Sequence, residues 1–516
     1  MRHRAITLAL LVVGAASLWL GAPPDVAAHA LGQTFQLPVP LWLYLTAAGI
    51  AVSASFVVAL VVLHPAGAVA SYPTRPLPPR SARSASVLLS VLGLAWWAWA
   101  LWTAFAVGDI TPVPAILFWV LLWVGLPIVA VVLGNPWPSL SPFRTLFGLL
   151  EAGGRRLGVE RLDMGLAYPR WLARWPAVAL LYGAIWAELV LPSRTDASRV
   201  GAILLGYTLL TLAGMTLFGR IAWLRNAELF EVLLGWFGRI GPLGRRSRAD
   251  ELCDGCGDDC SPTACVDCPE CSAAAEADER RPELRPWFSG LMEVRRAGWS
   301  DAAFIVLALA GVTFDGLLET TLWGNVLDIL FPPLNALLDP AAASVAAGSI
   351  GLLGLWLLFL AAFWVALLVS RRLAATRTAS AGGSGASIGL HAVTLLPIAG
   401  GYLIAHYLTE VIQGVQWLPE LLGDPFSPVE PSLDWIPIQL VWYLSVAAIV
   451  VGHVAAVLLS QRLVARDAPS RTLLAGLPLV LLMIGYTVLS LWIIAQPITV
   501  DPGQPLLSLV APFASI

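Results

Sequence analysis

The chain has 516 residues, of which 58% are hydrophobic and only 12% are charged, and its formal net charge is -3. Its mean hydropathy of +0.78 is too high for an ordinary soluble globular protein. The composition therefore predicts an all-α polytopic membrane protein, a bundle of transmembrane helices. Its surroundings would be the lipid bilayer, and we expect no nucleic-acid partner.

The first residues are typical of a secretory signal peptide. Arg2 and Arg4 precede an apolar stretch at 5–20, and small residues follow at 26–30. We expect 1–28 to be a signal peptide that is removed. Cleavage after Ala28 would make His29 the first residue, whose amine and ring nitrogen form a chelating pair suited to copper or another borderline metal. Cleavage after Ala30 would remove it.

About ten stretches after the signal are long and apolar enough to cross a bilayer as helices. They lie at 40–64, 85–107, 113–134, 171–191, 199–224, 301–323, 342–370, 387–412, 435–460 and 473–498. We expect five spans in a first transmembrane part, 29–248, and five in a second, 299–516. A cytoplasmic Cys-rich loop, 249–298, would separate the two parts.

The charges of the connecting loops predict the orientation of the spans. Arginine gathers in alternate loops, around 75–83, 144–170, 225–248, 371–377 and 462–471, and these are expected to be cytoplasmic. The loops between them are mainly acidic. We therefore expect a multi-pass protein of the cell membrane with both mature termini on the extracytoplasmic side. Three segments are expected not to span: interfacial helices at 142–157 and 227–240, and an external loop or shallow hairpin at 324–340.

All six cysteines of the chain lie in one acidic segment between 249 and 286. Their spacing is C-x2-C-x3-C-x4-C-x2-C-x2-C. Because the segment is expected in the cytoplasm, where thiols are kept reduced, disulfides are the less favoured reading. Two C-x2-C pairs can close a tetrahedral thiolate site, so we predict zinc bound by Cys253, Cys256, Cys268 and Cys271. Cys260 and Cys265 could join a second metal or an iron-sulfur cluster.

Several ionisable residues are expected within the bilayer, near the extracytoplasmic ends of their helices. Asp315 and Glu319 lie four residues apart on one helix face, and so do His406 and Glu410. Glu188 is expected at a similar depth. A carboxylate in the centre of a membrane helix costs on the order of 3 kcal/mol, so several at one level call for a cation, shared protons or water.

This outer layer offers the donor types that a divalent cation binds. Imidazole nitrogen and carboxylate oxygen suit zinc or copper, and we predict such a metal on His406, Glu410, Asp315 and Glu319, with His29 as a further ligand. The structural alternative for any single member is a local hydrogen bond between packed helices.

A second layer, toward the cytoplasmic half, holds only histidines, namely His64, His391 and His453. His391, His406 and His453 could bind haem, although only His391 and His453 approach the matched depth that two axial ligands need.

Four stretches of the sequence resemble a known family. They are HALGQTFQLPVPLWLYL after the signal, FDG at 314–316, LLPIAGGYLIAHYL at 395–408, and VWYLSVAAIVVGHVAAVLL at 441–459. Together they are similar to polytopic membrane proteins of the fenitrothion hydrolase family, over nearly the whole chain except the Cys-rich segment. The resemblance implies a membrane protein linked to hydrolysis of an organophosphorus ester.

Two classes of function follow from these observations. In a metal-dependent hydrolase of organophosphorus or related apolar esters, metal would supply hydroxide, Asp315 and His406 would be catalytic, and Glu188 would orient water or act as general base. In a non-enzymatic transporter, or a copper- or proton-handling protein, the same residues would form a relay. The sequence leaves open whether a companion membrane subunit completes the site.

Overall fold

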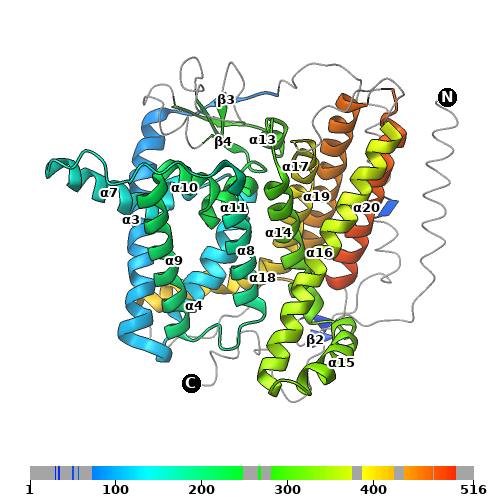
Figure 1. Ribbon diagram of the computed structural model, residues 1–516, viewed down its shortest axis with the longest axis horizontal. Coiled ribbons are helices and arrows are strands. Elements are labelled where there is room, and N and C mark those ends of the chain that lie inside the picture. The colour runs from blue at the N-terminus through cyan, green and yellow to red at the C-terminus, as the bar shows by residue number, and fades with distance from the viewer. Residues whose placement is uncertain are drawn as a thin grey trace. The chain divides into compact units, whose positions relative to one another are not determined.

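The computed structural model describes residues 29–30, 33–34, 49–50, 56, 72–247, 265–268, 280–374, 386–423, 435–468 and 470–494. The described chain is mostly helical (Figure 1). Within it, eight helices are long and apolar enough to cross a membrane: Ser84–Val107, Val113–Val132, Ala197–Phe218, Trp299–Leu318, Pro340–Ala374, Ile388–Leu418, Gln439–Asp467 and Thr472–Ile493. The prediction of a multi-pass helical membrane protein is confirmed at this level.

The long helices expose apolar side chains on their outer surfaces, as a membrane environment requires. Leu357, Leu358 and Val365, on the helix Pro340–Ala374, are 51%, 62% and 53% exposed. In water such a surface would be unfavourable, whereas lipid tails accept it without cost. The backbone polar groups of these helices are paired within each helix, which is the other condition for crossing the bilayer.

The chain forms two compact units. Unit 1 comprises Met1–Val69, Ile305–Leu408 and Ile436–Ile516, and unit 2 comprises Ala70–Phe304 and Thr409–Trp435. Each unit is described here by itself.

Unit 2 is built from many short and medium helices. They are α3 (Pro79–Trp102), α4 (Val113–Ala115), α5 (Leu126–Val132), α6 (Trp137–Leu140), α7 (Pro142–Arg156), α8 (Trp175–Leu189), α9 (Ala197–Phe218), α10 (Arg220–Asn226), α11 (Leu229–Gly238) and α13 (Ser289–Met292). Helical turns at Thr103–Val107, Gly108–Ile110, Ile116–Gly125 and Arg170–Leu172 complete the set. The predicted span at 199–224 ends early, because Gly219 adopts a left-handed φ of 84° between α9 and α10.

A small antiparallel sheet also belongs to unit 2. Its strands are β3 (Arg75–Pro76), β6 (Arg280–Leu284), β4 (Leu243–Ser247) and β5 (Cys265–Val266), in the spatial order β3-β6-β4-β5. In the register of β4 and β6, Ser247 lies opposite Arg280. The segment 249–298, which was expected to be a loop, thus contributes two strands to this sheet: β6 in its interior and β5 at its edge. Outside this sheet, β1 (His29–Ala30) pairs with β2 (Gln33–Thr34).

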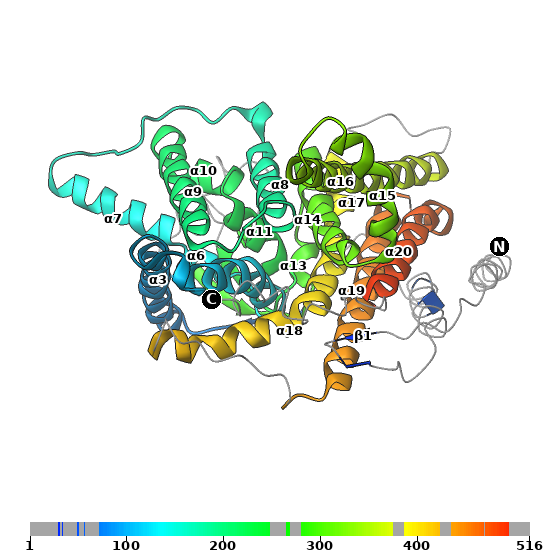
Figure 2. The ribbon, with the colours of Figure 1, turned by 90° about the horizontal axis from the view of Figure 1, so that it is seen from below.

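Unit 1 is a bundle of long helices. They are α15 (Thr321–Asn335), α16 (Pro340–Ala374), α17 (Ala386–Val393), α18 (Leu396–Gly423, which continues into unit 2), α19 (Ile438–Asp467) and α20 (Thr472–Ile494), together with most of α14 (Trp299–Leu318). Helix α20 packs against both α16 and α19 (Figure 1). Seen from below, α15 lies against α16 (Figure 2).

Two close approaches, each between a glycine and a backbone carbonyl group, fix the register of α18 against α19. A side chain at Gly401 would meet the carbonyl oxygen of Ala448 at 2.4 Å, and one at Gly452 would meet that of Pro397 at 2.3 Å. The backbones therefore approach as closely as glycine allows, a packing common between membrane helices.

Three expected segments differ in the structure. The fourth predicted span, 171–191, contains a helix of only 15 residues, α8. Segment 324–340 is not a loop but lies mostly in α15. Segment 227–240 forms α11, whose side chains are almost all buried rather than interfacial. The predicted span 40–64 lies almost wholly outside the described residues, as does the signal peptide.

Candidate functional site

The site of greatest chemical interest in unit 1 lies where α14 meets α18. One carboxylate oxygen of Asp315, Oδ2, lies 2.9 Å from Nε2 of His406 and accepts a hydrogen bond of 2.6 Å from the hydroxyl of Tyr407. The side chains of Asp315 and His406 are 20% and 16% exposed. The predicted convergence of these two residues is therefore confirmed, and the cluster remains within reach of solvent.

Glycine at 316 allows a tyrosine to join this cluster. A Cβ atom at Gly316 would lie 2.8 Å from the hydroxyl oxygen of Tyr402 and 3.5 Å from Cε1 of His406. Tyr402 is completely buried, its ring centroid is 5.9 Å from that of His406, and its hydroxyl has no hydrogen-bond partner in the described structure. A buried hydroxyl of this kind needs a polar partner, so it marks a place where a small polar molecule can bind.

Glu319 follows directly after α14 and interacts electrostatically with Asp315 and His406. Burial, and then the negative charge of Asp315, raises the pKa of the Glu319 carboxyl, while the His406 ring acts in the opposite direction. The site thus holds two carboxyl groups whose charges disfavour each other, beside one imidazole. The protonation state of each group in such a cluster depends on the charge of the others.

The remaining predicted residues of the outer layer are placed differently. Glu410 lies one turn after His406 on α18, in the part of that helix that belongs to unit 2. Glu188 also belongs to unit 2, where its carboxylate accepts a 2.7 Å hydrogen bond from the indole of Trp123. Its predicted role as a base beside Asp315 is therefore not supported by any contact within unit 1. His29 lies in β1, and its side chain is outside the described atoms.

The predicted metal sites find no support among the described residues. In this part of the chain, no three His, Cys, Asp or Glu side chains gather closely enough to hold a metal ion. Cys253, Cys256 and Cys271 lie outside it. Cys268 is buried next to β5, and Cys265 is disulfide-bonded, which differs from the expectation that the thiols are reduced. The spacing of the cysteines could not separate these two chemical states.

The two inner histidines of unit 1 are both buried. His453, fully buried on α19, hydrogen-bonds through Nδ1 to the carbonyl oxygen of Ile449 at 2.7 Å. Its Nε2 atom, and Nδ1 of His391 on α17, have no partner in the described structure. The haem reading remains untested.

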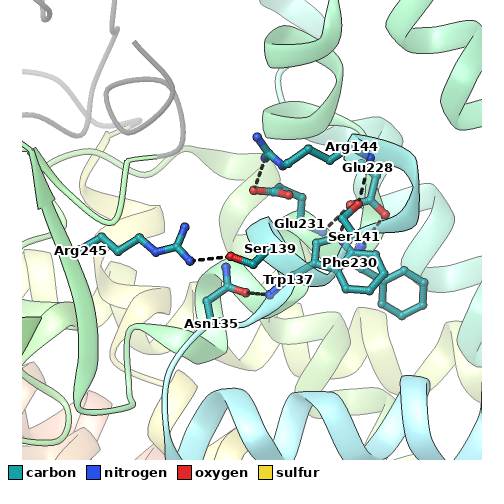
Figure 3. A network of polar contacts seen from close by, with 9 residues as sticks. All are labelled: Asn135, Trp137, Ser139, Ser141, Arg144, Glu228, Phe230, Glu231 and Arg245. Atoms are coloured by element: carbon teal, nitrogen blue, oxygen red, sulfur yellow. Dashed lines mark hydrogen bonds and ion pairs between the residues drawn. The ribbon is translucent and has the colours of Figure 1, made fainter. Parts of the chain in front are cut away.

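A second polar network, in unit 2, was not anticipated from the sequence. Glu228 is fully buried at the start of α11 and accepts hydrogen bonds from the backbone nitrogens of Phe230 and Glu231 and, at 3.0 Å, from the Trp137 indole (Figure 3). It also accepts one from the Tyr207 hydroxyl. Burial is the main cause that raises the pKa of Glu228 to about 7, and the negative charge of Glu231 adds to it, while the hydrogen bonds from Tyr207, Trp137 and the backbone nitrogen of Glu231 oppose it. A glutamate before an apolar helix is usually a solvent-facing cap, which is why its burial was missed.

The rest of this network joins helices to the sheet. Arg144 of α7 forms a 2.8 Å ion pair with the buried Glu231, and Arg245 of β4 donates to the Ser139 hydroxyl at 3.1 Å (Figure 3). Ser86 and Ser90 of α3 also donate to Ser139. Most of these groups are satisfied by one another. We therefore assign this network to structural stability.

No family model, curated protein or solved structure matches the chain. The resemblance to the fenitrothion hydrolase family stays a prediction, and function must be argued from the site. Tyr402 and Tyr407 were missed by the sequence reasoning. Tyr402 is four residues before His406 and Tyr407 is directly after it, and these positions could have indicated them. An aromatic residue in an apolar helix is, however, more often part of the packing.

Proposed function

We propose that this protein is a proton-handling membrane protein that takes up and releases protons at Asp315 and His406. The observation that supports this most is the double hydrogen bond to one oxygen of Asp315, from His406 and from Tyr407. An imidazole held by a carboxylate changes its charge near physiological pH, and a partly exposed one can exchange its proton with water.

Each residue has a distinct part in this proposal. His406 binds the transferred proton on its ring. Asp315 stabilises the resulting imidazolium and fixes the orientation of the ring, while the Tyr407 hydroxyl holds Asp315 in place. The Tyr402 hydroxyl lies at the buried end of the cluster, where it can donate to or accept from a water molecule that approaches His406.

The test is proton transport by the purified protein in liposomes. A pH-sensitive dye inside the vesicles would report proton entry when a potassium gradient and valinomycin set a membrane potential. We expect Asp315→Asn and His406→Gln to lower the rate roughly a hundredfold, and Tyr407→Phe to lower it less. Glu160→Gln removes a carboxylate at an exposed position outside the candidate spans and should leave the rate unchanged. A wild-type rate in Asp315→Asn contradicts the proposal.

A hydrolase is the second candidate. A histidine oriented by an aspartate is also the arrangement of a general base that activates water, and the exposure of both side chains gives a substrate access. In this candidate a divalent zinc or copper ion beside Asp315 and His406 would supply the positive charge for the phosphoryl oxygen of an apolar ester. Purified protein would then release nitrophenol from an aryl phosphotriester, and His406→Ala would abolish that release.

A further inference from the structure

The half of unit 1 farther from Asp315 and His406 contains several buried polar side chains that the described structure leaves unsatisfied. On α19 these are Nε2 of His453, the hydroxyl of Ser460 and both amide atoms of Gln461, and on α17 it is Nδ1 of His391. The three residues of α19 are completely buried, and His391 is 5% exposed. None of them belongs to the site described above.

Unsatisfied groups in this number are unusual inside a protein. A buried polar atom without a partner costs more free energy than a typical hydrogen bond contributes, and lipid offers it none. Most buried polar atoms are for that reason paired, with protein or with bound water. The group therefore marks a place where small polar molecules supply the partners.

The helix register places these residues in sequence along the bundle. Because Gly401 lies against Ala448 and Gly452 against Pro397, α19 runs antiparallel to α18. On α19, His453 and Gln461 are eight residues apart, or about 12 Å along the axis. His391 lies on α17, before the turn at Thr394–Leu395 that leads into α18, and so toward the Gln461 end of α19. A file of several water molecules spans a distance of this size.

A further unsatisfied polar group, the hydroxyl of Tyr402, lies between these residues and the Asp315–His406 site. The Tyr402 ring packs against Ile449, whose carbonyl oxygen holds Nδ1 of His453. The Tyr402 hydroxyl, on the other side, lies at Gly316 beside Asp315. Unsatisfied polar atoms thus follow one another from Tyr402, beside Asp315, through His453 to Ser460 and Gln461, with His391 toward the same end.

We propose that His453, His391, Ser460 and Gln461 bind a file of water molecules that conducts protons between the Asp315–His406 site and the opposite membrane face. This inference rests on the proposed function. In each transfer one O–H bond of a hydrated proton breaks and another forms on the next water, so charge moves without oxidation or reduction. Nε2 of His453 accepts a hydrogen bond from water, and the Gln461 amide both donates and accepts, so it can orient water in either direction.

The experiment uses the same proteoliposomes. His453→Phe and Gln461→Leu replace polar groups with apolar ones of similar size, and each should lower proton flux roughly tenfold or more. Thr487→Val is the matched control, because the Thr487 hydroxyl is also fully buried but is satisfied by the carbonyl oxygen of Met483 at 2.8 Å. It should leave the flux unchanged.

A second variant tests the path without removing a polar group. The Cβ atom of Gly476→Ala would meet Oε1 and Nε2 of Gln461 at 2.3 and 2.5 Å, so the amide must move. Alanine favours the helix, and folding should be retained. We expect a reduced flux in this variant, even if His453→Phe does not fold.

The outcomes separate the two proposals. If wild-type protein conducts no protons, the proposed function fails. If Asp315→Asn stops conduction while His453→Phe, Gln461→Leu and Gly476→Ala conduct like wild type, the proposed function stands and the water file is overturned.

Discussion

The buried carboxyl of Glu228 predicts a measurable dependence of stability on pH. Its pKa is about 7 in the folded protein, against a usual value of 4.5. Between these two values the folded protein keeps a proton that the unfolded chain has released. The stabilisation is therefore complete below pH 4.5 and is lost as the pH rises through 7. Each pH unit is worth about 1.4 kcal/mol, so the loss is about 3 kcal/mol.

The substitution Glu228→Gln isolates this contribution. An amide does not titrate, so the decline in stability between pH 5 and 8 should be smaller by about 3 kcal/mol, of the order of 6 °C in melting temperature. The variant should also be less stable than wild type at pH 5, because an amide has one acceptor oxygen and four donors point at this side chain.

The assay is thermal unfolding of the purified protein in detergent, followed by tryptophan fluorescence at constant ionic strength. Glu160→Gln, at an exposed position, is the matched control and should follow the wild-type curve. If Glu228→Gln declines with pH as steeply as wild type, Glu228 does not titrate in this range, and the reasoning from its burial is refuted.

Two further substitutions test packing and charge. Arg144→Ala leaves the carboxylate of Glu231 buried without its ion pair and should cost about 3–5 kcal/mol, whereas Arg161→Ala, whose guanidinium is 70% exposed, should cost less than about 1 kcal/mol in the same unfolding assay. Gly316→Ala should displace the Tyr402 hydroxyl and lower proton flux in liposomes, and unchanged flux would show that the position of this hydroxyl does not matter.

Eight of the ten predicted spans correspond to helices that are long and apolar enough to cross a bilayer, because length and apolarity can be read directly from the sequence. The pairing of Asp315 with His406 could also be predicted. An ionisable residue in an apolar helix is stabilised by a polar partner at the same depth, and each of these two residues offers one to the other. Glu188 carried the same signal; in unit 2 its carboxylate accepts a hydrogen bond from Trp123, and its predicted role as a base stays a prediction. The sequence gives the position of a residue along its helix. It does not give the neighbouring helix that the side chain contacts, because that depends on how the helices pack.

The residues that were missed share a different cause. In Tyr402 and Tyr407 the hydroxyl group makes the residue part of the site, and in Glu228 the carboxylate makes it the centre of the network. The rest of each side chain has an ordinary packing or capping role. Sequence patterns report the class of a side chain, whereas a hydrogen bond depends on where one atom ends up. The break of the predicted span 199–224 at Gly219 has a similar origin, because apolar residues continue on both sides of it.

The register of β4 and β6 bears on how the Cys-rich segment is accommodated. Ser247 and Arg280 face each other in the ladder, so the chain departs and returns at adjacent positions of one hairpin tip. Between these two positions β5 returns to the sheet, where Cys265 lies opposite Ser247, and Asp267 forms a 2.6 Å ion pair with the buried Arg285. The segment therefore supplies one strand and one carboxylate to unit 2, and its removal would leave the guanidinium of Arg285 buried without this partner.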